Sequence, residues 1–275
     1  MQNKESKGLR FLYNTIPGRL ILKIPKARWV SRIVGRYMDS RLSKHMIKKF
    51  VRKNNINLDD YYSDNFRCFN DCFTRKIKED RRPIDMDKNH FISPCDGLLS
   101  VYKIDKDVVL PIKQSSYTIS QLFENDNISA KFENGYCLVF RLCVNHYHRY
   151  CYLDNANKEK NVFIKGTLHT VRPIALARYP VFIRNCREYT IMHTENFGDV
   201  AQIEVGAMLV GKIKNNDNEA SVKRGDEKGM FLYGGSTIIV LVNDKNVEID
   251  KQFFENTNNM TETPVLMGQA IGKKI

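Results

Sequence analysis

The chain has 275 residues, of which 42% are apolar and 11% aromatic, so it is long enough for one large domain or two small ones with a substantial core. Its seven cysteines are odd in number and scattered, which excludes a disulfide framework. No apolar run approaches the roughly 18 residues of a membrane span, and the first residues lack the pattern of a signal peptide. We therefore expect a protein of the cytoplasm or of its membrane surface.

The net charge of +13 belongs to one segment of the chain. Residues 1–53 hold 15 of the 44 Lys and Arg residues and only 2 of the 31 Asp and Glu residues, which leaves the rest of the chain with 29 of each sign. From Lys26 the apolar residues follow a helical period, with Trp29, Ile33 and Tyr37 in one row. Arginines recur every four residues on the opposite face, at positions 28, 32 and 36.

An amphipathic helix with a basic face and a tryptophan suits the surface of an anionic bilayer, where cations meet phosphates and apolar side chains enter the acyl region. Two other interpretations of residues 1–53 stay open. One is a helical subdomain that docks on the body with its basic face in water. The other is an arm that binds nucleic acid.

The next segment, residues 54–80, predicts one more amphipathic helix. Phe66, Phe69, Phe73 and Ile77 have the spacing of one helix face, and Pro83 ends the pattern. Cys68 and Cys72 lie on this helix, but without a second pair they are not a zinc signature, and we interpret them as buried thiols.

From Phe91 the chain predicts short strands between polar turns. Apolar runs occur at 98–102, 108–112, 136–144, 162–164, 189–192, 200–203 and 208–210, and a last strand and turn occupy 265–272. There is no GxGxxG after a strand, no P-loop and no HExxH helix. We predict an α+β fold, in which a basic amphipathic helical region (1–53) precedes a β-rich catalytic body (54–275) of mostly antiparallel strands.

Several polar groups of this body are candidates for chemistry. Asp96 lies in a turn, Ser93–Gly97, before a strand. His146 and His148 follow an apolar run, and in strand geometry they share a face. No convincing third and fourth ligand accompanies them, so acid–base work is favoured over a metal site. His169 lies in a strand that Gly166 begins.

Arg187 and Glu188 come just before a predicted strand, and they either orient a substrate anion or form a structural ion pair.

The stretch Gly234-Gly235-Ser236-Thr237 joins two apolar runs, 230–233 and 238–242, at a glycine corner. One interpretation is a hairpin turn followed by a serine. The other is a potential nucleophile, Ser236, next to the carbonyl of Gly235, which no side chain shields.

Taken together and in order, these stretches resemble the phosphatidylserine decarboxylase family of pyruvoyl-dependent, self-processing proenzymes. The resemblance runs from about Phe69 to Gly272. It rests on the stretches 73–75, 82–84, 93–97, 147–149, 166–173, 205–207 with 210–211, and 228–229 leading to 234–237.

The resemblance implies that Ser236 attacks the carbonyl of Gly235 and that the chain then splits between these two residues. Residues 1–235 become the larger (beta) chain and residues 236–275 the smaller (alpha) chain. Ser236 becomes a covalent pyruvoyl group, which forms a Schiff base with the amine of phosphatidylserine. Loss of CO₂ then gives phosphatidylethanolamine. The resemblance places Asp96 and a histidine in a charge relay with Ser236.

The same resemblance implies two partners, phosphatidylserine and an anionic membrane surface, with the protein peripheral on the cytoplasmic face of the cell membrane. The two cleaved chains form a heterodimer, and a further dimerisation stays open. No nucleic acid and no metal are expected.

One position departs from the family pattern. Many members carry a second histidine three positions after the one in Tyr-His-Arg, where this chain has Cys151. We expect His148 to be the cleavage base and the proton donor, with His169 as the second choice for the base. A Cys151 thiolate is disfavoured, because apolar surroundings keep a thiol protonated.

Two rival functions remain at this stage. One is a related pyruvoyl decarboxylase that acts on another amino acid or another serine lipid. The other is a non-enzymatic module that binds nucleic acid through residues 1–53.

Overall fold

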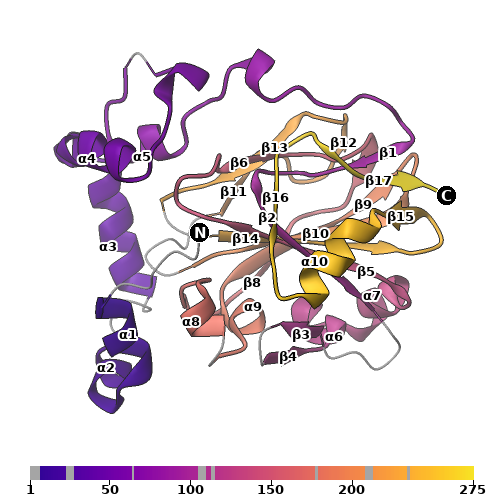
Figure 1. The fold of residues 1–275 in the computed structure, drawn as a ribbon, viewed down its shortest axis with the longest axis horizontal. Helices are drawn as coiled ribbons and strands as arrows, with labels where there is room; N and C mark the ends of the chain where they lie inside the picture. The colour runs from indigo at the N-terminus through magenta and orange to yellow at the C-terminus, as the bar shows by residue number, and fades with distance from the viewer. Residues whose placement is uncertain are drawn as a thin grey trace.

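A computed structural model describes residues 7–22, 28–63, 65–104, 110–112, 115–176, 179–207, 213–233 and 236–275. The N-terminal region is helical, with α1 (Lys7–Asn14), α2 (Ile16–Ile21), α3 (Arg28–Met38), η1 (Arg41–His45) and α4 (Met46–Lys53). Figure 1 shows these helices as a column beside the body. Within the ranges given above, no helix has the length and apolar character needed to cross a membrane.

A large antiparallel sheet forms the centre of the body (Figure 1). Its order is β12 (Ala220–Val222), β7 (Ala156–Lys158), β9 (Arg187–Thr194), β10 (Gly198–Val205), β14 (Ser236–Asn243), β5 (Gly135–Leu142), β2 (Gly97–Lys103) and β16 (Thr263–Val265), and β8 (Val162–Ile164) pairs with β9. The β14 strand lies in the middle because five β-branched or aliphatic residues in a row, 238–242, can be buried on both faces.

The two faces of this sheet carry separate cores, because successive side chains of a strand point to opposite faces. One face packs against short helices: α6 (Ile119–Phe123), α7 (Asp126–Ser129), η4 (Ala130–Phe132), α8 (Pro173–Leu176) and α9 (Val181–Arg184). Tyr13 and Leu22, from the N-terminal region, join this core. The other face packs against α10 (Lys251–Asn258) and two small sheets.

The first small sheet has the order β1 (His90–Ile92), β17 (Ala270–Lys274) and β15 (Val247–Ile249). The second has the order β11 (Ile213–Asn215), β13 (Glu227–Phe231) and β6 (Arg149–Cys151), and we call it the upper sheet. Strands β3 (Leu110–Ile112) and β4 (Ser115–Tyr117) form a separate pair. The predicted α+β class with a mostly antiparallel body is therefore confirmed.

Four local predictions were wrong, and the fourth, the strand around His169, is described with the site. The helix expected over 66–77 is only α5 (Phe69–Phe73), because the chain turns at Thr74 and the buried Arg75 guanidinium donates to the carbonyls of Cys72 and Phe73. The remaining short turns of this segment are η2 (Leu58–Asp60) and η3 (Glu79–Arg81).

The second and third errors concern a turn and a hairpin. His146 and His148 lie in the turn between β5 and β6, not in a strand. The runs around Gly234 are not a hairpin, since β13 pairs within the upper sheet and β14 within the main sheet. Residues 108–109 and 208–210 of the predicted strands and Gly234-Gly235 of the predicted cleavage corner lie outside the described residues.

The helical region shares a small core with the segment that follows it. Met38 and Ile47 pack with Phe69, Cys72 and Phe73, so apolar contacts cross the predicted boundary at residue 53. This core positions α5 beside the site described next.

Candidate active site

The candidate residues gather at one end of the main sheet because neighbouring strands run antiparallel. Ser236 begins β14 and pairs with Leu142, the last residue of β5. The Asp96-Gly97 step begins β2, and Leu98 pairs with Arg141, so Gly97 and Leu142 fall in one row. At a strand spacing of about 4.8 Å, Gly97 and Ser236 lie roughly 10 Å apart across this row.

Ser236 is fully buried at this end of the sheet. Its side chain shares a face with Leu142, which belongs to the core under the upper sheet. The hydroxyl oxygen is buried and has no hydrogen-bond partner among the described residues. A buried polar group without a partner is costly and is frequently functional, which singles out Ser236 from the other serines of the strands.

Asp96 is nearly fully buried and is tied on both sides. Arg82 donates from Nε to Oδ1 at 2.8 Å and from its terminal nitrogen to Oδ2 at 2.7 Å. The Met267 amide donates to Oδ1 at 2.9 Å. Its carboxylate also faces His146, whose pKa is lowered, mainly by burial. Asp96 is therefore held as a fixed negative charge at the start of β2.

His148 lies in the turn after β5, over the same end of the sheet. Its Nδ1 hydrogen-bonds with the carbonyl of His146 at 2.9 Å, and its ring packs on Phe73 of α5 with centroids 4.1 Å apart. Its own carbonyl accepts from the Phe231 amide at 3.0 Å. That contact places His148 beside the last residue of β13, the strand that leads toward residue 235.

His169 lies on the other side of the sheet end, and its ring faces the N-terminal region. The ring stacks on Tyr179 at 4.6 Å and lies 3.3 Å, Nδ1 to hydroxyl, from Tyr13 of α1. Asn185 ties the backbone of this segment to β10, because its Nδ2 donates to the carbonyls of both His169 and Gly206. The segment around His169 has no strand pairing beyond an isolated bridge at Thr167, so the predicted strand there was wrong.

The comparison with known proteins agrees with this arrangement. The family model for phosphatidylserine decarboxylase matches residues 69–273. The chain belongs to the phosphatidylserine decarboxylase family.

Similar proteins match along nearly the whole chain. A phosphatidylserine decarboxylase proenzyme 2 of Clostridium acetobutylicum is 44% identical over 266 residues, which cover 96% of this chain and 91% of that protein. Phosphatidylserine decarboxylase proenzymes of Clostridium botulinum and Clostridium kluyveri are each 41% identical over 274 residues, 98% of this chain and 93% of each relative. The predicted resemblance, and with it a carboxy-lyase that converts phosphatidylserine to phosphatidylethanolamine, is confirmed.

Cys151 lies where many members of the phosphatidylserine decarboxylase family have a histidine, and the structure encloses it completely. Burial raises the pKa of its thiol to about 12. Its amide donates to the carbonyl of Pro94 at 2.9 Å, so it lies beside the turn that carries Asp96. A thiol that stays protonated at neutral pH is a poor base, which agrees with the expectation that Cys151 is not the cleavage base.

Two groups of this site escaped the sequence analysis. Asn70 of α5 accepts from the Tyr233 amide at 3.1 Å, next to Gly234, and donates to Asp39 at 2.7 Å. The Tyr233 ring packs edge-on against Phe69 at 4.9 Å and Phe73 at 5.4 Å. The only signal in the sequence was the aromatic spacing of α5, which we attributed to helix packing alone.

Arg187 has a structural role in this fold. It is fully buried in β9, donates to the carbonyls of Leu122 and Ile183 at 2.7 Å, and pairs with Glu124 at 3.2 Å. Of the two alternatives, a substrate-orienting group and a structural ion pair, these contacts support the structural one. The assignments of Asp96, His148, His169 and Ser236 to individual steps stay predictions.

Proposed function

We propose that this chain is a proenzyme that cleaves itself between Gly235 and Ser236 and then decarboxylates phosphatidylserine with a pyruvoyl group derived from Ser236. The observation that carries the proposal is the position of Ser236. A buried hydroxyl with no partner among the described residues stands at the first residue of a central strand, directly after the glycine corner of the sequence.

The surroundings of Ser236 fit a pyruvoyl group. Its neighbours across the strand and along its face, Leu142 and Ile238, are fully buried and apolar. Such an enclosed site excludes water from a reactive carbonyl. When bound to the substrate amine, a pyruvoyl group supplies an electron sink for the departure of CO₂.

Self-cleavage requires a nucleophile and a base from the chain's own residues. Ser236 Oγ attacks the carbonyl carbon of Gly235, the peptide C–N bond breaks, and an ester takes its place. A base must accept the hydroxyl proton during this attack and later the proton on Cα of Ser236, so that elimination separates the chains. His148 is our choice for this base, because it lies beside Phe231 at the entrance to the cleavage corner.

Asp96 acts through its charge in this proposal. Arg82 and Met267 fix the carboxylate at the same end of the sheet as Ser236. A fixed negative charge favours the protonated form of a nearby imidazole and so strengthens the base. After cleavage, we assign to His148 the proton donation that completes the decarboxylation.

We also propose that the protein binds the cytoplasmic face of the cell membrane through its N-terminal helices. Ile16, Leu20 and Leu42 expose 60–75% of their surface there, and Ile33 exposes 57%. The same helices also expose arginines and lysines, at positions 19, 32, 36, 41, 44 and 48. Helices that expose both large apolar side chains and cations suit an anionic lipid surface. The side chain of Trp29 lies outside the described residues.

The intact mass of the purified protein tests the cleavage. We expect two chains that separate at Gly235–Ser236, the smaller with an N-terminus that is blocked to sequential degradation. Ser236→Ala should stay full length and inactive. A single uncleaved chain that still decarboxylates phosphatidylserine would overturn the proposal.

The two histidines are separated by comparing His148→Ala with His169→Ala, with cleavage and turnover measured independently. We expect His148→Ala to slow cleavage by about 10²- to 10⁴-fold, the usual contribution of a general base. If neither variant impairs cleavage, the assignment of the base is wrong.

A further inference from the structure

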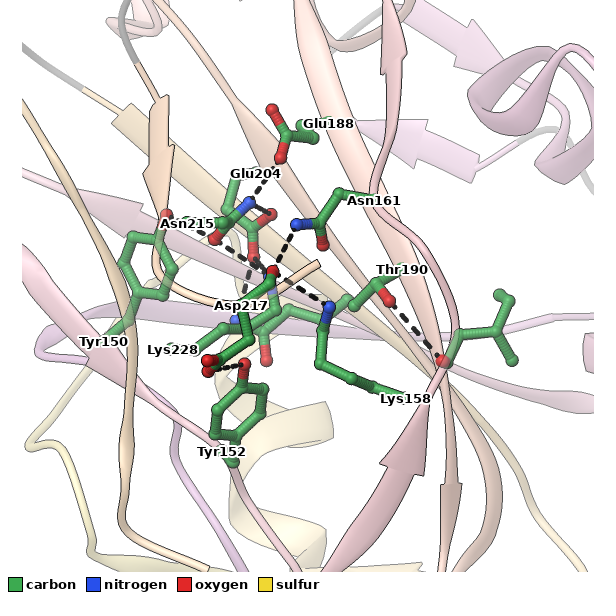
Figure 2. A network of polar contacts seen from close by, with 12 residues as sticks. Tyr150, Tyr152, Lys158, Asn161, Glu188, Thr190, Glu204, Asn215, Asp217 and Lys228 are labelled. Carbon is green, nitrogen blue, oxygen red and sulfur yellow. Dashed lines mark hydrogen bonds and ion pairs between the residues drawn. The ribbon is translucent and has the colours of Figure 1, made fainter. Parts of the chain in front are cut away.

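A buried polar cluster lies between the main sheet and the upper sheet, close to the site but outside the residues considered so far. Its centre is an ion pair between Lys228 of β13 and Glu204 of β10, with Nζ and Oε1 2.7 Å apart. Both side chains are completely enclosed. Figure 2 shows the two groups meeting Asn215, with Glu188 and Tyr150 at the edge of the cluster.

Asn215 fixes the geometry of the cluster because it uses its whole hydrogen-bonding capacity. Its Oδ1 accepts from Lys228 Nζ and from the Tyr150 hydroxyl, both at 3.1 Å. Its Nδ2 donates to Glu188 at 2.8 Å and to Glu204 at 3.3 Å. A side-chain amide has two donors and two acceptor positions, so a cluster that fills all four has one well-defined arrangement.

One member of the cluster lies in a strand that flanks the cleavage corner, and the others lie in neighbouring strands. Lys228 lies in β13, which leads to Tyr233 and on to Gly235. Glu204 pairs across the sheet with Ile238, two residues after Ser236 and on the same face as Ser236. Tyr150 lies in β6, two residues after His148. The Lys228–Glu204 pair therefore joins the strand before the scissile bond to the neighbour of the strand after it.

Buried ion pairs contribute little net stability, so the Lys228–Glu204 pair is a candidate for another role. Removing two charges from water costs so much that apolar side chains of similar size are frequently as stabilising. What a buried pair does provide is one fixed geometry, here between two sheets that no other described ion pair of comparable burial connects.

We propose that Lys228 and Glu204 are positioning residues for self-cleavage, a role that rests on the cleavage proposed above. Their ion pair holds the end of β13 over β10, so that the chain entering the corner presents the Gly235 carbonyl to Ser236 Oγ. Attack is fast only when the reacting atoms are held about 3–3.5 Å apart in the right orientation. In this step Oγ bonds to the carbonyl carbon, the C–N bond breaks, and the hydroxyl proton passes through the base to the freed amine.

The experiment follows precursor and product after synthesis of the full chain in a cell-free system. The variants are Lys228→Met, Glu204→Gln and the double substitution. The double substitution leaves no unpaired buried charge, so it keeps a folded precursor available if a single variant fails to fold. We expect each variant that folds to cleave about 10- to 100-fold more slowly than the wild type, as for a misplacement of about 1 Å.

Lys158→Met is the matched control. Lys158 is also a buried lysine near the cluster (Figure 2), but it donates to the carbonyls of Glu159, Asp217 and Asn218, none of which lies in β13 or β10. We expect this variant to lose stability and yet to cleave at the wild-type rate. Slowing by Lys158→Met to the same extent as by Lys228→Met, at equal thermal stability, would overturn the positioning role.

Hydroxylamine identifies the step that is affected. It cleaves an ester at residue 236 by forming a hydroxamate on Gly235 and leaving Ser236 with a free amine. If Lys228 and Glu204 position the attack, their variants form the ester as slowly as they cleave, so hydroxylamine should not restore the wild-type rate of cleavage. Restoration to the wild-type rate would overturn the proposal. A wild-type chain that does not cleave at all would instead contradict the proposed function, so the two failures are distinguishable.

Discussion

Cys151 shows how one residue changes the assignment of roles in this site. The thiol is enclosed, and its pKa near 12 keeps it protonated at neutral pH. The sequence alone indicated that a thiolate was disfavoured, since the residue stands between aromatic neighbours. The degree of burial depends on how β6 packs over the main sheet, and that long-range packing has no signal within the local sequence.

Cys151→Ser tests whether the thiol takes part in cleavage. Because a protonated thiol accepts no proton, we expect a rate loss far smaller than the roughly 10²- to 10⁴-fold that removing a general base costs. The measurement is the rate of precursor loss between pH 6 and pH 9, with Cys137→Ser as the control at another enclosed thiol. A rate loss in the general-base range, confined to Cys151→Ser, would reinstate this cysteine as the base.

Arg82 and Asp96 form the pair that fixes the charge of the site. Their side chains expose 17% and 6%, and two short hydrogen bonds join them. Arg82→Met leaves the Asp96 carboxylate buried without its main partner, which should destabilise the precursor by about 3 kcal/mol, the lower end for breaking a buried pair. Chemical denaturation of the Ser236→Ala chain with and without Arg82→Met measures this loss of unfolding free energy. An unchanged unfolding free energy would show that water replaces the guanidinium.

At the scale of the elements, the sequence predicts strands better than it predicts their partners. The run 238–242 is apolar on both faces, and it does form a central strand. The neighbouring run 230–233 looked like its hairpin partner, but β13 pairs with β6 and β11 instead. Pairing was not predictable because the ladder forms with Arg149–Cys151, far away in the sequence. The sequence also did not predict that Lys228 and Glu204 form a buried ion pair between the two sheets.

The bulge in β13 depends on Gly229. The register of β13 against β6 shifts between Glu227 and Gly229, which turns Lys228 inward. A Cβ on Gly229 would lie 2.8 Å from Asn215 Oδ1, 2.9 Å from the Tyr150 hydroxyl and 2.4 Å from a backbone oxygen. We therefore expect Gly229→Ala to destabilise the fold by about 1–3 kcal/mol, the usual cost of overpacking. Thermal unfolding of the Ser236→Ala precursor measures this cost, with Gly35→Ala as the control.

The control makes the same Gly→Ala substitution at a site where the added Cβ meets no neighbouring atom. Gly35 lies in α3 and has nothing within 4 Å of the added Cβ. Its replacement by alanine should be neutral or slightly stabilising, since alanine favours helices more than glycine does. Equal melting temperatures of the wild type and Gly229→Ala would mean that the bulge relaxes without cost.

At the scale of the whole molecule, the sheet would hold together the two chains of the proposed cleavage. Residues 236–275 supply β14 to the middle of the main sheet, β16 to its edge, and β15 and β17 to a small sheet. This segment contains no cysteine, so no disulfide can join it to residues 1–235. We expect the two chains to co-purify in native buffer with or without a reducing agent and to separate only in denaturant. Dissociation in native buffer would show that cleavage loosens the sheet.

The N-terminal helices expose both large apolar side chains and basic residues. The sequence predicted the charge and the helical period of this region, but it could not show which of its apolar residues are buried in the core. In the structure Val34 and Met38 face the core shared with α5, whereas Ile33 and Leu42 face outward. Tyr13 packs beside the stacked rings of His169 and Tyr179, with centroids 6.1 and 6.0 Å away, which fixes α1 to the body near the end of the main sheet. A lipid bound to this region would therefore lie at the same end of the molecule as Ser236.

Membrane binding is testable on the uncleaved Ser236→Ala chain, which removes turnover from the measurement. The triple substitution Ile16→Ser, Leu20→Ser, Leu42→Ser should weaken binding to vesicles of phosphatidylserine and phosphatidylcholine in a flotation assay. Each side chain exposes at least 60%, so its replacement costs little folding free energy. Loss of the transfer free energy of three large aliphatic side chains, at about 1.5–3 kcal/mol for each one fully inserted, should reduce the bound fraction at least 100-fold.

The control for this experiment changes exposed apolar residues of the body, with Met86→Ser, Met260→Ser and Leu266→Ser combined. This triple variant should float with the vesicles as the wild type does. Electrostatic attraction by the basic helices falls with ionic strength, because the screening length shortens from about 14 Å at 0.05 M salt to about 4 Å at 0.5 M. The inserted apolar area continues to contribute, so binding of the wild type should weaken over this range but persist. If both triple variants bind equally well and salt alone abolishes binding, charge without insertion holds the protein on the membrane. If the chain instead binds DNA and ignores vesicles, the basic region belongs to the alternative class of nucleic-acid arms.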